Sequence, residues 1–188
     1  MSYILPDTAE RAQKIIEIVA KKSFGLFKKR AFRKPLNWDS LSPEEQDRIF
    51  NEIVISGVTL AALMTESIAN ESKKKNSEQY FRELSMEIRS AYGNYILSLG
   101  APKKYADMFK TVIDMRAKEY RKDYLVDKKE LILKNKRESS AWHMIVAIGG
   151  YYHIVRGDEK MADDVRHFKL FRDFIYHLTH SIISAISP

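Results

Sequence analysis

Residues 42–70 read SPEEQDRIFNEIVISGVTLAALMTESIAN, and this stretch decides the fold class. It opens with a serine, a proline and, at position 45, a glutamate, which is the residue order that caps and starts an α-helix. Apolar side chains then recur every three or four residues from Ile49 to Ile68. This spacing predicts a helix from residue 43 to about residue 70. Few polar residues interrupt residues 53–65, so we expect this helix to be buried at the centre of the molecule.

The apolar part of this stretch is too short to cross a membrane. Residues 53–65 form an uncharged run of 13 positions between two glutamates, whereas a membrane-spanning helix needs about 20. We therefore expect a buried core helix and no transmembrane segment.

Helical patterns flank the central stretch on both sides, with capping spacings at Asp7–Glu10 and Asp127–Glu130. The first expected helix runs from about residue 8 into a basic stretch and ends at Gly25 or Lys34. The next begins after the candidate cap Ser77 and closes at Gly100, and another carries Tyr105 and runs to about Leu125. The last two run from Lys128 to Arg156, with a break near Ser139 and Ser140 left open, and from the candidate cap Asp158 to about Ile186. Gly100 followed by Pro102 is typical of a left-handed helix end.

The small number of turn-forming residues supports the same fold class. The chain holds seven glycines and five prolines in 188 residues, too few for the closely spaced turns of a β-sandwich or barrel. We predict an all-α fold, a single-domain bundle of about six helices covering residues 1–188. Two smaller domains are the alternative.

Composition limits the chemistry. The chain has no cysteine, which excludes disulfides, thiolate metal sites and a cysteine nucleophile. The first six residues lack the basic and apolar regions of a secretory signal. We expect a soluble, cytoplasmic protein without a cofactor.

The positive charge is concentrated in one segment. The chain has 32 basic and 25 acidic side chains, and residues 18–38 contain no acid. The seven basic residues there account for the whole excess: Lys21, Lys22, Lys28, Lys29, Arg30, Arg33 and Lys34.

Residues 21–34 are therefore the predicted contact surface. If their helix is continuous, Phe24, Phe27 and Ala31 form a narrow apolar stripe flanked by cations. Such a stripe suits a nucleic acid or another polyanion, and also a membrane surface or a partner helix. Two structural interpretations stay open: cations near a helix end offset its dipole, and the phenylalanines belong to the core.

The five histidines do not predict a metal centre. The Glu-x-x-His motif of di-iron bundles is absent from the sequence. Asp173, His177 and His180 have the spacing of zinc ligands on a helix, but a basic polar face surrounds them. We expect a solvated face there and no metal. His143 and His153 are expected to be hydrogen-bonded core histidines.

Residues 172–177 read RDFIYH. This run resembles the Arg-x4-6-His signature of the HEPN superfamily of helical nucleases and nucleotide-binding domains. A polar residue often follows the arginine in that family, as Asp173 does here. The resemblance implies metal-independent RNA cleavage at a dimer cleft, with His177 as general acid and base and Arg172 stabilising charge on phosphorus. It covers six residues.

The sequence thus predicts a helical binding or regulatory protein that contacts an acidic partner such as nucleic acid through residues 21–34. The alternative is a HEPN-like ribonuclease using Arg172 and His177, so the sequence leaves open whether the chain is an enzyme. Ten tyrosines and nine phenylalanines are also compatible with a ligand pocket or a homo-oligomer interface.

Overall fold

The computed structural model describes residues 7–135, 138–156 and 164–186, apart from the side chains of residues 127–140. It confirms the predicted all-α class, because the described residues form helices and connections and no strand. The helices are α1 (Thr8–Phe27), α2 (Arg30–Arg33), the 3-10 turn η1 (Trp38–Ser40), α3 (Pro43–Glu71), α4 (Lys75–Ser98), α5 (Lys103–Asn135), α6 (Glu138–Ile154) and α8 (Val165–Ile186).

Helix α3 begins where the sequence predicts. The Ser42 hydroxyl accepts a hydrogen bond from the Glu45 backbone N–H at 3.3 Å, and Pro43 occupies the first helical position. The Glu45 side chain does not reach back as a capping box requires; it instead accepts hydrogen bonds from Arg48. The cap therefore rests on Ser42 and Pro43.

The expected burial of α3 is confirmed, since every residue from Ile53 to Thr65 is buried. Among the described helices, only α3 has the length and apolar composition to cross a membrane. In this structure, however, 89% of its apolar window is covered by neighbouring helices.

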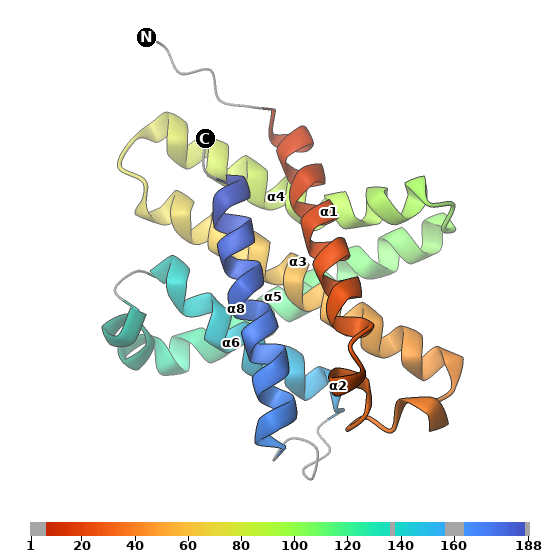
Figure 1. Cartoon of the computed structure of the whole chain (residues 1–188). Helices are drawn as coiled ribbons and strands as arrows, with labels where there is room; N and C mark the ends of the chain where they lie inside the picture. The colour runs from red at the N-terminus through yellow and green to blue at the C-terminus, as the bar shows by residue number, and fades with distance from the viewer. Residues whose placement is uncertain (1–6, 136–137, 157–163, 187–188) are drawn as a thin grey trace.

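Helix α3 passes through the middle of the molecule (Figure 1). Helices α1 and α8 lie side by side and antiparallel across it, and the Arg11 guanidinium near the start of α1 donates to the Ala185 carbonyl near the end of α8 at 2.5 Å. Helices α4, α5 and α6 cover the other sides of α3. One hydrophobic cluster contains side chains from all of these helices.

Two adjacent glycines allow α6 to approach its neighbours closely. A Cβ atom at Gly149 would overlap the ring of Tyr120 on α5, and one at Gly150 would overlap the Ser56 hydroxyl on α3. Tyr120 is fully buried, so its ring has little room to move away. The glycine pair therefore sets the distance between α6 and the centre of the bundle.

The turn between α4 and α5 has the predicted form. Gly100 has φ +89°, the left-handed region that favours glycine. The Gly100 N–H donates to the Leu97 carbonyl and the Ala101 N–H donates to the Ile96 carbonyl, which is the Schellman helix end.

Several predicted helix limits were wrong. Helix α4 begins at Lys75 rather than Ser77, and α5 continues past Leu125 to Asn135. No glycine or proline lies between Pro102 and Gly149, so no helix-breaking residue ends α5 near Leu125. The spacing of Asp127 and Glu130 fits a helix interior as well as a cap. A new helix, α6, does begin near the serines, at Glu138.

The predicted helix start at Asp158 lies outside the described residues. The last described helix begins at Val165. Its cap is Asp164, whose carboxylate accepts hydrogen bonds from the Arg166 and His167 N–H groups at 3.0 Å each.

Candidate functional site

The basic segment is not one continuous helix. Helix α1 ends at Phe27, Lys29 is extended with φ −70° and ψ 121°, and α2 then begins at Arg30. The predicted end at Gly25 or Lys34 and the continuous apolar stripe were therefore wrong. In a straight helix, Phe27 and Phe32 would point about 140° apart. The break lets both rings turn inward.

Most aromatic side chains of this region pack into the interior beneath the cations. Phe27 packs against Trp38 and Phe50, with ring centroids 4.7 and 4.9 Å apart. Phe32 and Trp38 are buried, and only Phe24 is half exposed. The interpretation of these aromatics as core is thus correct for Phe27, Phe32 and Trp38.

The structure also weakens the helix-dipole interpretation of the cations. The last turn of α1 contains no basic residue. Lys28 is the first residue beyond the helix, and its ammonium lies over the Phe24 ring at 4.7 Å. Arg30 and Arg33 do lie in the last turn of α2, but that helix has only four residues. An effect on the helix dipole falls off within the last turn, so it leaves most of the segment's charge unexplained.

We call residues 28–39 the basic loop. It surrounds a cavity of about 510 Å³, which we call the basic cavity. Seven residues line it: Lys28, Arg30, Arg33, Lys34, Asn37, Trp38 and Asp39. Four cations thus share this cavity with one carboxylate. Arg33 lies over the Trp38 ring at 5.0 Å and is 3.5 Å from Asp39. The side chain of Asp39 is 99% exposed, so this pair is weak.

Lys28, Arg30 and Lys34 are exposed and form no ion pair with a described residue. Of the remaining predicted contact residues, Lys29 is exposed but does not line this cavity, Lys22 is exposed on α1, and Lys21 lines a different cavity. The structure therefore brings together four of the seven predicted cations.

A buried histidine holds the basic loop against α8. His167, which is 1% exposed, lies with Nε2 at 2.8 Å from the Phe32 carbonyl oxygen and Nδ1 at 2.9 Å from the Tyr151 hydroxyl. A carbonyl only accepts, so Nε2 donates and Nδ1 of the neutral ring accepts from the tyrosine. Burial lowers the pKa of His167, against smaller opposing effects of Phe32 and Asp164.

The residues of the ribonuclease motif lie elsewhere, on α8. Arg172 is half-buried and pairs with the adjacent Asp173 at 3.0 Å. His177 is exposed, with its ring beside Tyr176. Neither residue lines the basic cavity. The ribonuclease motif stays a prediction.

The histidines form no metal centre among the described residues, where no group of three or more candidate ligands is found. His177 and His180 are exposed, as expected for a solvated face. His153 is hydrogen-bonded, but it is half-buried and belongs to a charge network rather than to the apolar core.

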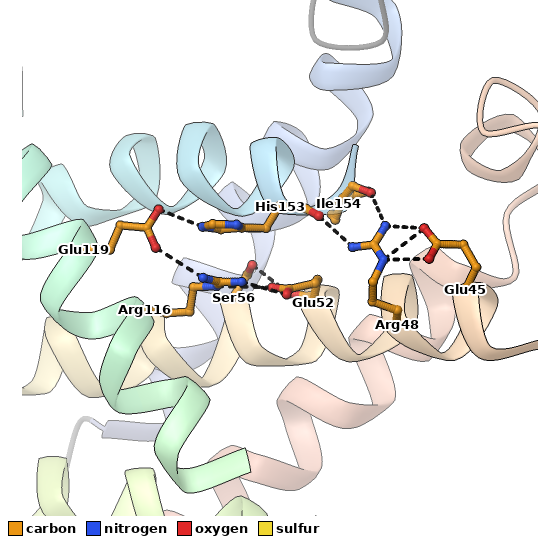
Figure 2. Close-up of polar contacts among 8 residues, drawn as sticks. All are labelled: Glu45, Arg48, Glu52, Ser56, Arg116, Glu119, His153 and Ile154. Carbon is orange, nitrogen blue, oxygen red and sulfur yellow. Dashed lines mark hydrogen bonds and ion pairs between the residues drawn. The ribbon is translucent and has the colours of Figure 1, made fainter. Parts of the chain in front are cut away.

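This charge network joins α3, α5 and α6 (Figure 2). Arg116 pairs with Glu52 at 2.8 Å and with Glu119 at 3.3 Å, and Glu119 accepts from His153 Nε2 at 2.7 Å. The side chains of Glu52 and Arg116 are only 12% and 16% exposed. The network ties α5 to both of its neighbours.

Arg48 extends these contacts to the end of α6 (Figure 2). It holds Glu45 at 2.6 Å and donates to the His153 and Ile154 carbonyls at 2.7 and 2.8 Å. These carbonyls have no partner within the helix, so Arg48 caps it from another element. The hydrogen bond from Arg48 lowers the pKa of Glu45.

Sequence reasoning missed this network and three of the residues that line the basic cavity, Asn37, Trp38 and Asp39. Arg48 and the carbonyls it caps are more than 100 residues apart, so no local pattern connects them.

The chain was compared with known proteins at three levels. It matches no protein-family model, no curated protein and no solved structure.

Proposed function

We propose that this protein binds nucleic acid through its phosphates, with the basic cavity as the contact site. The supporting observation is that Lys28, Arg30, Arg33 and Lys34 gather around one cavity with a single, exposed carboxylate. Like charges held together repel one another, and a bound polyanion relieves that repulsion. Arginine forks and lysine ammonium groups are the usual phosphate ligands.

The arrangement of side chains around the basic cavity favours contacts to the phosphate backbone of the nucleic acid rather than to its bases. Trp38 is 4% exposed, so its ring has no free face on which a base can stack. Phe24, at 49% exposure, is the remaining candidate for stacking beside the cations. We therefore expect strong salt dependence and weak sequence preference.

The test is a fluorescence anisotropy titration of labelled single-stranded RNA at two salt concentrations. The test variant is Lys28→Ala/Arg30→Ala/Lys34→Ala, because these side chains are exposed and form no ion pair with a described residue. The matched control is Lys73→Ala/Lys74→Ala/Lys75→Ala, which removes the same charge from an exposed basic run at the start of α4. We expect weaker binding in the test variant and a salt slope smaller by about 2, since each lost phosphate contact removes about 0.7.

Equal affinity and equal slope for the wild type and the test variant would contradict the proposal. An equal loss in both variants would also contradict it, because it would show a response to net charge rather than to the basic cavity.

A further inference from the structure

A second and larger cavity shares no lining residue with the basic cavity. It has a volume of about 900 Å³ and is lined by side chains of α1, α3, α4 and α5. In Figure 1 the α4–α5 turn and the first half of α3 diverge on the right of the view, and α1 crosses in front of the bundle beside them. Its volume is within the range of small-molecule binding sites.

The wall of this cavity is rich in aromatic rings. Six of them line it: Phe24, Phe50, Tyr92, Tyr95, Tyr105 and Phe109. Aromatic faces attract cations, and two of these rings already do so within the chain. The ammonium of Lys28 lies 4.7 Å from the Phe24 centroid, and that of Lys104 lies 5.1 Å from the Tyr105 centroid.

The ionisable groups of the cavity are mostly acidic, although the chain as a whole has a net charge of +7. Glu52 is paired with Arg116, and Arg48 is paired with Glu45. The lining groups that form no ion pair with a described residue are Glu17, Glu44, Asp47 and Lys21. Three carboxylates therefore face one cation around this cavity.

A tyrosine also belongs to the wall. Tyr92 is only 4% exposed and lines the cavity. Burial raises the pKa of Tyr92 to about 12, with a smaller contribution from Tyr95. The hydroxyl is therefore protonated at neutral pH, and its oxygen is able to accept a hydrogen bond from a bound group.

We propose that this cavity binds a hydrophobic organic cation, a small molecule with an apolar body and an ammonium group. The rings and aliphatic side chains cover the body. The ring faces and the carboxylates of Glu17, Glu44 and Asp47 attract the ammonium. An anion of the same shape would be repelled by these carboxylates and should therefore bind more weakly. This ligand proposal does not rest on the proposed nucleic-acid contact, although Lys28 of the basic cavity touches Phe24 of this one.

The test uses two probes with the same ten-carbon chain, decylammonium and decanoate, below their micelle concentrations. Binding to the full chain is measured by isothermal titration calorimetry. We expect decylammonium to bind with one-to-one stoichiometry and at least tenfold more tightly than decanoate.

Two variants locate the site. Glu17→Gln/Asp47→Asn removes two of the unpaired carboxylates and is expected to weaken decylammonium binding at least fivefold. Its control, Glu10→Gln/Glu87→Gln, changes two exposed carboxylates outside the cavity lining and is expected to bind like the wild type. Ala20→Trp fills the cavity from α1 and is expected to abolish binding, whereas Ala9→Trp, on the exposed start of α1, is expected to leave it intact.

Circular dichroism melts establish that each variant is folded before its affinity is compared. The proposal is overturned if decylammonium does not bind, if decanoate binds as tightly, or if the Glu17/Asp47 variant binds as well as its control. Since Glu17 and Asp47 are exposed, that pair of variants still decides the matter if Ala20→Trp fails to fold.

Discussion

The basic loop and the end of α6 are both held by polar side chains, but of opposite kinds. A neutral, fully buried histidine joins the Phe32 carbonyl of the basic loop to Tyr151 on α6. Charged and partly exposed side chains hold the end of α6, with Arg48 at its centre. A buried neutral bond is insensitive to salt and costly to leave unmade. An exposed charge pair is screened and replaceable by water. The two regions should therefore respond differently to mutation, salt and pH.

The largest effect on stability is expected at Gly149, where the α6 backbone approaches the Tyr120 ring of α5. Gly149→Ala places a methyl group against the buried Tyr120 ring, and such overpacking costs about 3 kcal/mol. The control is Gly25→Ala on α1, where nothing lies within 4 Å of the added Cβ. That variant should be neutral or more stable by up to about 1 kcal/mol. Urea unfolding of both proteins measures the difference, and similar stabilities would contradict the close packing of α6.

Removing the buried His167 side chain is expected to have the next largest effect on stability. His167→Leu leaves the Phe32 carbonyl and the Tyr151 hydroxyl without their shared partner, at a cost of about 2 kcal/mol. The loop should also open, so hydrogen exchange at residues 30–34 should accelerate. The exposed His177→Leu is the control and should change stability by less than about 0.5 kcal/mol. Unchanged exchange in His167→Leu would mean that this histidine does not hold the loop.

The same control addresses the ribonuclease prediction. RNA cleavage by the wild type that disappears in His177→Leu would favour a HEPN-like activity. Labelled RNA that stays intact with the wild-type protein would contradict it.

A smaller loss of stability is expected when Arg48, the charged side chain at the end of α6, is replaced. Arg48→Met removes the cap of the His153 and Ile154 carbonyls but keeps an apolar stem of similar length. Because the Arg48 side chain is 22% exposed, water can reach these groups, and the expected cost is about 1 kcal/mol. Raising the salt concentration should reduce the difference between wild type and variant, which thermal melts at two ionic strengths will show. A loss equal to that of His167→Leu would remove the contrast between the two regions.

The smallest effect is a difference in pH response. The folded-state pKa of His167 is lowered from 6.5, so the unfolded chain takes up this proton first as the pH falls. The histidine's contribution to stability is present above about pH 6.5 and decreases below it. The pKa of Glu45 is lowered from 4.5, so its contribution persists to lower pH and is lost on passing below that value. Urea unfolding from pH 7 to pH 4 should show the first loss in the wild type and not in His167→Leu.

The sequence predicted the elements that depend on neighbouring residues. Ser42 and Pro43 start α3 where expected, and Gly100 ends the α4 region with the expected left-handed turn. The long apolar run of α3 correctly indicated a buried central helix.

The features that the sequence did not predict depend on contacts between residues far apart in the chain. The break at Lys28 and Lys29 contains neither glycine nor proline; it follows from burying Phe27 against Phe50 and Phe32 against His167. The contacts of Arg48 and Arg116 join residues far apart in the chain. The larger cavity collects side chains from four helices, and no spacing along one helix could reveal it.

The ammonium of Lys28 over the Phe24 ring has a consequence for how the two cavities behave together. Lys28 lines the basic cavity, and Phe24 lines the larger one. A molecule that takes the face of Phe24 competes with Lys28 for it, and a phosphate that draws Lys28 away exposes that face. Two ligands that alter one shared contact cannot bind with independent affinities, and linkage requires the effect of each on the other to be equal. The affinity for RNA measured with and without decylammonium would give the size of that coupling.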